Sequence, residues 1–393
     1  MSKPLRPHQL TILLVTTLLL FVSACGDEGP ATTPNQDNKN DETELPPAFE
    51  AHFTQPEPGE DDDTISQTVI DLLDMTPEGA TVRAAMYTFS REPVAEAFGD
   101  AVERGVDVEM VLGNLSTHYD GSDWTAVELL RDLLGDRLYI CRDGEDEGGC
   151  IGERIQHNKF ITFSELEDGS EHVVVQTSAN LTHAQLQEID NLVVLRYDTA
   201  LYDAYRSYWK DLRAAQPDPE YNRVEVGDNS TRVYFFPHSN GDPIVDNLQK
   251  VDCESGADVY LAMAFFTNAR RDVASELRAL DEQGCSVHAV LRQDQHTGSP
   301  GAQVESDLRR GNIDFALFTY DAPINLHSKY LLVDGAFGPD SEHQSIVWTG
   351  SHNYTLSALR YNDETILEIR DRDLFEDFLD DWQQIRDRAQ TVN

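Results

Sequence analysis

Histidine and lysine recur at one fixed spacing in two distant places of this 393-residue chain. The run QHNKFITF contains His157 and Lys159, and the run LHSKYLLVDG contains His327 and Lys329. With 12 histidines and only six lysines in the chain, chance alone would place about 0.2 such pairs. Two copies therefore indicate a shared chemical role, and these four side chains are the candidate catalytic groups.

Two histidines and two lysines suit chemistry at a phosphodiester. An unprotonated imidazole attacks phosphorus near neutral pH, and a second, protonated imidazole supplies the proton that the leaving group needs. Two imidazoles placed close together divide these tasks because their interaction separates their titration steps. Ammonium groups stabilise the charge that builds on the phosphoryl oxygens. We expect no cofactor and no metal, since no histidine has the cysteine or carboxylate spacing of a metal site.

A small polar turn follows each of these motifs after a second apolar run. VVVQTSANLT contains Ser178 and Asn180, and IVWTGSHNYT contains Ser351 and Asn353. Serine and asparagine commonly form turns, so a purely structural role is the simpler interpretation of each residue alone. Their repetition after both His-x-Lys motifs favours a second role, in which hydroxyl and amide groups hold the phosphate.

Carboxylates downstream of these turns are candidates for orienting the imidazole rings. A carboxylate that accepts a hydrogen bond from one ring nitrogen determines which nitrogen reacts. Glu364 lies after the second turn, in the sequence NDE. After the first turn, Asn191 lies at the equivalent offset and Asp190 is the predicted carboxylate. In a chain this acidic, a solvated surface position is the competing interpretation of both.

The combined pattern, His-x-Lys-x(4)-Asp followed by Gly-Ser-x-Asn and present twice, resembles the phospholipase D superfamily. The second copy is complete and includes Asp334 and Gly350. The first copy has Ser164 in place of the aspartate and Thr177 in place of the glycine. The resemblance covers roughly residues 50 to 385. It implies a covalent phosphohistidine on His157, with His327 as general acid, although the symmetry of the two copies leaves this assignment reversible.

The elements that must position these groups also repeat. TVRAAMYTFS, beginning at Thr81, aligns with DVYLAMAFFT, beginning at Asp258, and both are typical of buried strands. A helical pattern follows each run and ends at Gly105 or Gly284, before a second apolar run. Strand, helix and strand in this order predict parallel strands covered by helices.

We therefore predict an α/β fold of two homologous lobes, each a mixed β-sheet flanked by helices, with the active site at the lobe interface. The expected lobes span residues 49–220 and 221–393, with the boundary in the sequence PDPEYN. Helical spacing in ALYDAYRSYWKDLRAA and LFEDFLDDWQQIRDRA predicts a helix at the end of each lobe, packed on that lobe.

The first 24 residues have the pattern of an export signal. A basic start precedes a short apolar run, and the sequence VSAC ending at Cys25 resembles a bacterial lipobox. The resemblance implies cleavage before Cys25, lipid modification of Cys25 and anchoring in the cell envelope, facing the periplasm or the exterior. An ordinary signal peptide is the alternative. Residues 25–48 are acidic and poor in apolar side chains, which predicts a flexible tether.

Four further cysteines suit disulfides in an exported protein. Cys141 and Cys150 enclose a short loop rich in glycine and acidic residues, and Cys253 with Cys285 is the natural second pair. Four cysteines allow three connectivities. Free thiols and a zinc site are the alternatives, but no paired Cys/His spacing supports zinc.

The charge balance limits the choice of substrate. The chain has 71 acidic and 30 basic side chains and a formal net charge of −41, which disfavours long nucleic acids as partners. We therefore expect a membrane-tethered phosphodiesterase that hydrolyses phospholipid head groups or transfers them to an alcohol. A nuclease-type phosphodiesterase and a catalytically silent phosphate-binding lipoprotein are the alternatives. Head group and oligomeric state are left open.

Overall fold

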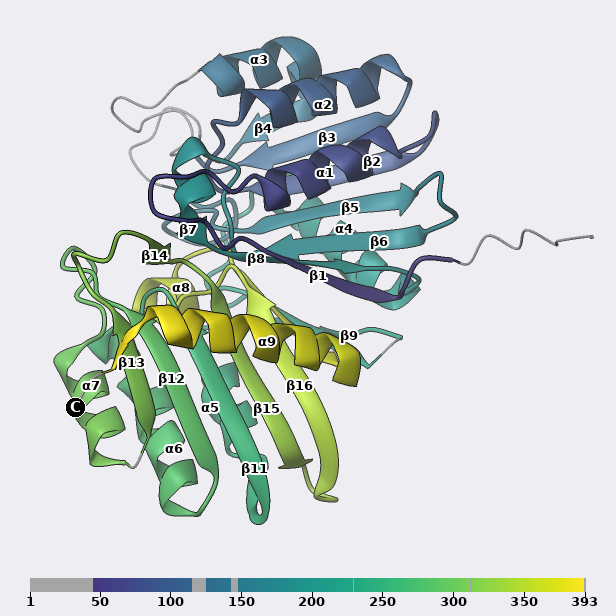
Figure 1. Cartoon of the computed structure of the whole chain (residues 1–393). Helices are drawn as coiled ribbons and strands as arrows, with labels where there is room; N and C mark the ends of the chain where they lie inside the picture. Colours follow the sequence, from purple (N-terminus) through teal and green to yellow (C-terminus); the bar gives the residue numbers. More distant parts are fainter. Residues whose placement is uncertain (1–44, 115–124, 143–147, 229, 312, 392–393) are drawn as a thin grey trace, which may run out of the picture. The chain divides into compact units, whose positions relative to one another are not determined.

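The computed structural model describes residues 45–391, except for 115–124, 143–147, 229 and 312. From Leu45 onward the chain forms one compact unit, and Figure 1 shows its two sheets. The predicted export signal, Cys25 and nearly all of the predicted tether lie outside the described residues. Within the described ranges, no helix is both long enough and apolar enough to cross a bilayer.

The first sheet has seven strands among the described residues, in the order β1-β8-β6-β5-β2-β3-β4. Strands β2, β3 and β4 pair in parallel, and the other neighbours pair antiparallel. The strands are β1 (Phe49–Phe53), β2 (Thr81–Met86), β3 (Asp107–Leu112), β4 (Leu138–Ile140), β5 (Lys159–Glu165), β6 (Glu171–Thr177) and β8 (Asn191–Leu195). The parallel part of the sheet is the strand–helix–strand unit predicted from the repeat.

The second sheet repeats this plan with nine described strands, in the order β18-β13-β12-β11-β15-β16-β17-β10-β9. Strands β11, β12 and β13 are its parallel part. The strands are β9 (Arg223–Val226), β10 (Thr231–Phe235), β11 (Val251–Met263), β12 (Ser286–Arg292), β13 (Asp314–Phe318), β15 (Lys329–Phe337), β16 (Glu342–Gly350), β17 (Thr365–Arg370) and β18 (Gln390–Thr391). Two mixed sheets flanked by helices confirm the predicted α/β fold class.

Helices cover the sheets in three groups, each with its own apolar cluster. The first group packs on the first sheet and the second group on the second sheet. The third group, α4 and α9, shares one cluster with strands of both sheets. The helices are α1 (Thr64–Asp74), α2 (Glu92–Glu103) and α3 (Thr125–Leu134) in the first group, α5 (Pro243–Leu248), α6 (Arg271–Glu282) and α7 (Ala302–Arg310) in the second, and α4 (Thr199–Ala214) and α9 (Arg372–Arg388) in the third.

The repeat extends to the way in which α4 and α9 attach to their sheets. The indole of Trp209 in α4 donates a hydrogen bond of 2.9 Å to the carbonyl of Ala84 in β2. The indole of Trp382 in α9 donates one of 3.0 Å to the carbonyl of Leu261 in β11. Ala84 and Leu261 occupy the same place in the two aligned runs. The two lobes are therefore alike in their buried polar contacts as well as in their strand order.

These two helices contact more of the molecule than we predicted. Each was expected to pack on its own lobe, but each also contacts the other sheet. In α9, the ring of Phe378 lies 5.0 Å from Phe53 of β1 and 5.1 Å from Tyr330 of β15. In α4, the ring of Tyr208 stacks 4.2 Å from Phe235 of β10. Apolar side chains of both helices belong to one cluster with strands of both sheets, so the helices join the two lobes through one core. In Figure 1, α9 runs along the boundary between the two sheets.

Both pairs of cysteines that we favoured are bonded in the structure. The disulfides join Cys141 to Cys150 and Cys253 to Cys285, each with Cα atoms 5.0 Å apart. The first lies at the end of β4. The second ties β11 to the segment between α6 and β12.

We predict that Phe378→Ala destabilises the whole unit, because the ring is fully buried between elements of both lobes. The loss of packing should lower the free energy of unfolding by about 3–5 kcal/mol. Urea denaturation followed by circular dichroism measures this change. Gln383→Ala, on the exposed face of the same helix, is the control and should change stability by less than about 0.5 kcal/mol. A similar effect of both variants would contradict the shared core.

Candidate active site

The two His-x-Lys motifs lie at the starts of equivalent inner strands. Lys159 is the first residue of β5 and Lys329 the first residue of β15. Lys159 pairs with Met86, the last residue of β2, and Lys329 pairs with Met263, the last residue of β11. Both β2 and β11 belong to the parallel part of their sheet. The motifs therefore lie at the carboxyl ends of the parallel strands, where α/β sheets commonly bind ligands.

Short backbone pairings cross from one lobe to the other at this edge. Strand β14 (Asn325–Leu326), just before His327, pairs in parallel with β7 (Glu188–Ile189) of the first lobe. Gln156, just before His157, forms a parallel bridge with Asp363 of the second lobe. Each histidine segment is thus held by the segment of the other lobe that precedes an orienting carboxylate.

The carboxylates orient the imidazoles across the same boundary. The Nδ1 atom of His157 lies 2.8 Å from Oε2 of Glu364, and Nδ1 of His327 lies 2.8 Å from Oδ1 of Asp190. Both carboxylates are fully buried, whereas the histidines keep 8% and 7% exposure. An imidazole that donates its Nδ1 proton to a carboxylate carries a lone pair on Nε2. Both histidines line one cavity, so each can present its Nε2 atom there.

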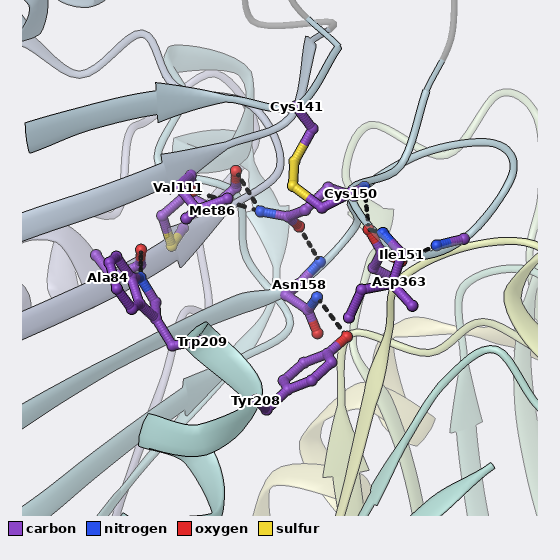
Figure 2. Close-up of a disulfide and its surroundings, with 12 residues drawn as sticks. Ala84, Met86, Val111, Cys141, Cys150, Ile151, Asn158, Tyr208, Trp209 and Asp363 are labelled. Carbon is purple, nitrogen blue, oxygen red and sulfur yellow. Dashed lines mark hydrogen bonds between the residues drawn. A yellow bond between two sulfur atoms is a disulfide. The ribbon is translucent and has the colours of Figure 1, made fainter. Parts of the chain in front are cut away.

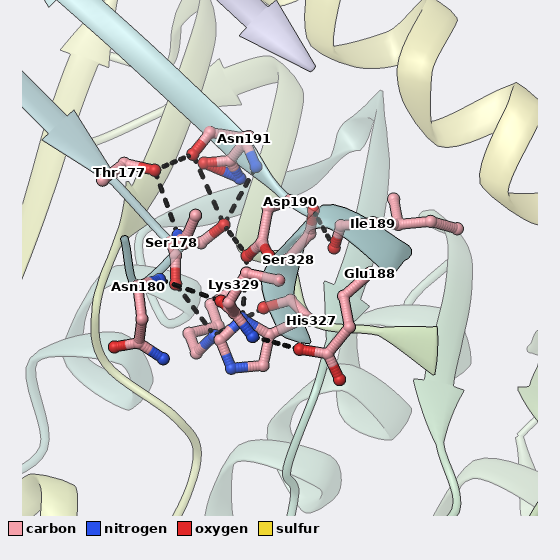
Figure 3. Close-up of polar contacts among 12 residues, drawn as sticks. Thr177, Ser178, Asn180, Glu188, Ile189, Asp190, Asn191, His327, Ser328 and Lys329 are labelled. Carbon is pink, nitrogen blue, oxygen red and sulfur yellow. Dashed lines mark hydrogen bonds and ion pairs between the residues drawn. The ribbon is translucent and has the colours of Figure 1, made fainter. Parts of the chain in front are cut away.

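The serines of the small polar turns hold these carboxylates. The hydroxyl of Ser178 donates to Asp190 at 2.7 Å, and that of Ser351 donates to Glu364 at 2.6 Å. The prediction gives both serines a role in binding phosphate or in orienting the catalytic groups, and their buried contacts with the carboxylates fit the orienting role. Figure 3 shows this network around Asp190 and His327.

The structure also shows which of the two neighbours, Asp190 or Asn191, is the counterpart of Glu364. The backbone N–H of Ser178 donates to the carbonyl of Asn191, just as that of Ser351 donates to the carbonyl of Thr365. Asn191 is thus the equivalent of Thr365, the first residue of β17, and Asp190 is the equivalent of Glu364. The connection after the first turn is one residue shorter, so the equal offset in the sequence pointed to Asn191. The Asn191 side chain instead accepts a hydrogen bond of 2.8 Å from Thr349.

The two lysines lie beneath the histidines. Lys159 donates a hydrogen bond of 2.8 Å to the carbonyl of His157, and Lys329 donates to the carbonyl of His327. The Nζ atom of Lys329 is also 3.2 Å from Nδ1 and 3.3 Å from Nε2 of His327. Burial lowers the pKa of Lys159 well below its usual range and that of Lys329 to about 8. Their charge reaches the site through a region with little water, where electrostatic interactions are strong.

A cavity of about 550 Å³ opens above these groups. Asn180 and Asn353 line it, as predicted for phosphate-holding amides, and each has a buried Oδ1 atom without a hydrogen-bond partner in the described part of the chain. The lining residues are Tyr87, Ile155, His157, Asn180, Phe265, Thr267, Thr297, His327, Asn353, Thr355, Leu356, Ser357, Asn362 and Glu364. Hydroxyl and amide groups predominate, so the cavity suits a polar group.

Three further residues shape the cavity. Tyr87 and Phe265 form walls, and the ring of Tyr87 meets that of His157 edge-on at 4.7 Å. Asn362 also lines the cavity and donates a hydrogen bond of 3.0 Å to Glu364. Asn362 could have been predicted as a site residue, because it belongs to the same NDE run as Glu364. The two aromatic residues differ from core residues only in their place at strand ends.

Asp334 lies elsewhere. Its carboxylate forms an ion pair of 2.9 Å with Arg372 of α9 and accepts a hydrogen bond of 2.7 Å from Ser345. Ser164, at the corresponding place in the first lobe, accepts the backbone N–H of Thr81 at 2.9 Å. Both residues lie further along the strand than the lysine of their motif and make contacts outside the cavity lining. The replacement of aspartate by Ser164 in the first copy therefore does not change the contacts of the histidines.

Glu188, Asp190 and His327 have potential metal-ligand atoms within 4.8 Å of one another. The ammonium group of Lys329 already lies 3.2 Å from Nδ1 of His327, so a cation is present there. In the other such group, Asp363 with Cys141 and Cys150, the two sulfur atoms are bonded to each other. These two cysteines are therefore not available as thiolate ligands.

The two imidazoles differ in their electrostatic surroundings. Burial, reinforced by Lys159 and Lys329, holds the pKa of His157 well below its usual range. Burial also lowers the pKa of His327, but the charge of Asp190 opposes this shift. Burial raises the pKa of Glu364 to about 8, whereas Lys159 and the hydrogen bonds from Ser351 and Asn362 favour its charged form. His327 therefore binds a proton more readily than His157 does.

Comparison with known proteins gives a family and a fold. The family model described as "Cardiolipin synthase, PLD-like domain" matches residues 69–213 and 253–386. The crystal structure of phosphatidylserine synthase from Haemophilus influenzae Rd KW20 superposes with a TM-score of 0.58 and 15% identity, covering 89% of this chain and 90% of that one. Polyphosphate kinase from Porphyromonas gingivalis gives 0.55 at 13% identity over 86% of this chain, which spans half the length of that kinase. Among curated proteins, no sequence matches this chain.

We predict that affinity for a phosphodiester falls as pH rises through about 8. Above this pH Lys329 loses its positive charge, which removes an attraction for the anion. A phosphodiester keeps one negative charge over this range, so the change reports on the protein. Calorimetric titration with a short-chain glycerophosphodiester should show about tenfold weaker binding at pH 9.5 than at pH 7. Constant affinity would contradict the electrostatic account, and Lys329→Met should flatten the profile.

Proposed function

The chain belongs to the phospholipase D-like family, and we propose that it cleaves the head-group phosphodiester of phospholipids, passing the phosphatidyl group to water or to an alcohol. The observation that carries this proposal is the pair of histidines at one cavity, each oriented by a buried carboxylate of the other lobe. The family match and the fold support phosphodiester chemistry, and the proposal adds the substrate and the mechanism.

In the first step, Nε2 of His157 attacks phosphorus and the bond to the head-group oxygen breaks. Protonated His327 donates its proton to that oxygen, which leaves as an alcohol. In the second step, His327 removes a proton from water or from an acceptor alcohol, and the resulting oxygen attacks phosphorus. The bond to His157 then breaks and releases phosphatidic acid or a new phosphodiester. Asn180 and Asn353 hold the non-bridging oxygens while the buried lysines offset their charge.

The electrostatics favour His157 as the nucleophile. Its pKa lies well below the usual range, so its lone pair is available throughout the neutral range. Asp190 partly restores the proton affinity of His327, which suits a group that must donate a proton and then accept one. Glu364 fixes Nδ1 of His157 and directs Nε2 towards the cavity.

A phospholipid suits the charge distribution better than a polynucleotide does. Nucleic-acid enzymes bind several phosphates with a track of basic side chains. Among the described residues that line this cavity there is no arginine. Three arginines near the site are paired with carboxylates: Arg270 with Asp242, Arg271 with Asp307 and Arg292 with Glu188. Arg154 donates a hydrogen bond of 3.0 Å to Ser357 of the cavity lining, and a single arginine does not form a track. A lipid anchor at Cys25 in the cell envelope would bring the cavity to its substrate.

Trapping the intermediate tests the mechanism. We expect label from a phospholipid to appear on His157 after a quench that preserves phosphohistidine, as located by mass spectrometry. His157→Ala should lower turnover by about 1,000-fold or more, and His327→Ala by about 100- to 10,000-fold. His183→Ala, a histidine outside the cavity lining, is the control and should keep wild-type turnover. Label on His327 would reverse the assignment, and full turnover by His157→Ala would refute the mechanism.

Substrate choice needs a separate assay. Purified protein is incubated with labelled phospholipid vesicles and, separately, with single-stranded DNA, both with chelator present. We expect release of choline or ethanolamine and no DNA cleavage. Cleavage of DNA alone would favour the nuclease alternative. Failure with both substrates would favour the silent phosphate-binding lipoprotein.

A further inference from the structure

The two halves of the site follow one plan except at the residue before each orienting carboxylate. Asp363 precedes Glu364 and bridges to Gln156, whereas Ile189 precedes Asp190 and pairs with Leu326. Ile189 is an ordinary buried apolar side chain. Asp363 is a fully buried carboxylate. A buried charge is costly, so its presence in only one half calls for a specific reason.

The carboxylate of Asp363 is held by backbone N–H groups of the other lobe. It accepts hydrogen bonds from the N–H groups of Cys150 at 2.6 Å and Ile151 at 3.2 Å, and also from Gly152. Cys150 is bonded to Cys141 at the end of β4, as Figure 2 shows. The carboxylate thus attaches the disulfide-bonded segment to the segment that carries Glu364.

The close approach leaves no room for side chains on the neighbouring glycines. A Cβ atom on Gly149 would lie 2.9 Å from Oδ2 of Asp363, and one on Gly152 would lie 2.3 Å from the carbonyl oxygen of Tyr361. Three N–H donors favour the charged form of Asp363, while burial raises its pKa to about 7. The segment of Gly149 to Gly152 and the segment of Tyr361 to Asp363 therefore pack closely, backbone against backbone.

The backbone of Asp363 holds the nucleophile's own segment. Its carbonyl accepts the N–H of His157 at 2.9 Å, and its N–H donates to the carbonyl of Ile155 at 2.9 Å. The next residue, Glu364, contacts the His157 ring. One residue thus links the disulfide, the main chain of His157 and the carboxylate that orients the imidazole. The His327 half has the backbone pairing but lacks the side-chain attachment.

We propose that Asp363, together with the Cys141–Cys150 disulfide, positions His157 for attack on phosphorus. Asp363 does not line the cavity and acts through the backbone of residues 150–157 and through Glu364. Releasing this attachment leaves the cavity intact but lets the His157 ring move. This proposal has a kinetic part and a structural part. The kinetic part rests on the proposed function, since it assumes that His157 reacts. The structural part, that the attachment immobilises residues 151–160 and not residues 321–330, stands independently.

The test compares Asp363→Asn and the double variant Cys141→Ser/Cys150→Ser with wild type. Hydrogen exchange is followed in peptides 151–160 and 321–330, which contain the equivalent histidines and are unaltered by either change. We expect exchange in 151–160 to accelerate about tenfold or more, with 321–330 unchanged. On a phosphodiester substrate, kcat should fall about 10- to 100-fold because the nucleophile is misplaced. KM should stay within about twofold because the cavity groups remain.

Matched controls separate positioning from general destabilisation. Cys253→Ser/Cys285→Ser removes the other disulfide, and Asp307→Asn removes a fully buried carboxylate that binds Arg271 and Arg278 in the second lobe. We expect both controls to lower the melting temperature and to leave kcat and exchange in 151–160 near wild type. Equal loss of kcat in the controls, or unchanged exchange and kcat in the test variants, would refute the proposal.

The outcomes also distinguish this proposal from the proposed function. If wild type turns over no phosphodiester, the proposed function fails. The exchange measurement then decides the positioning claim alone, with acceleration confined to 151–160 supporting it and no acceleration refuting it. If wild type is active and Asp363→Asn keeps full kcat, the proposed function stands and the positioning role is refuted.

Discussion

The crossed hydrogen bonds between imidazoles and carboxylates are the interaction on which the rest of the structure depends. Each lobe supplies one histidine and the buried carboxylate that orients the histidine of the other lobe. Separated, either lobe would keep a carboxylate such as Glu364 or Asp190 in an apolar interior without its main partner, which costs several kcal/mol. The shared core around α4 and α9 offsets this cost by holding the lobes at a constant spacing. Packing and chemistry are therefore coupled, because the core that joins the lobes also sets the distance between each ring and its carboxylate.

In the proposed mechanism the two related halves perform different tasks, and the same arrangement accounts for the difference. Symmetric histidines with identical surroundings would share their protons equally, and neither would be a dedicated nucleophile. Here burial and Lys329 lower the pKa of both histidines, but Lys159 lowers that of His157 further, whereas the charge of Asp190 raises that of His327. The extra attachment through Asp363 is on the His157 side only. Asymmetry in charge and asymmetry in anchoring thus fall on the same histidine, as expected if that histidine must approach phosphorus with a defined geometry.

Much of the fold could be predicted from the sequence, because the patterns that indicate it lie within short stretches of the chain. The aligned strand–helix–strand runs, the two His-x-Lys motifs and the cysteine pairs all depend on spacing along the chain. The crossed pairing could not be predicted, since no spacing says which lobe's carboxylate meets which ring. The sequence offset pointed to Asn191 instead of the predicted Asp190, because one residue is missing between the first turn and β8. The serine hydroxyls and the two-sided packing of α4 and α9 are tertiary facts that periodicity does not contain.

The net charge of −41 and a phosphate-directed site are compatible because the site's positive charge is short-ranged. Lys159 and Lys329 are buried, and their field acts strongly within the cavity but is lost in solvent beyond a Debye length of about 8 Å. A polynucleotide would gain little from two such cations, because its affinity comes from many phosphates neutralised along a surface. That surface is acidic here. A single phosphodiester that is already at the cavity entrance experiences the lysines and not the acidic exterior. Under the proposed function, a membrane would deliver one head group at a time, which would favour a phospholipid over a polynucleotide.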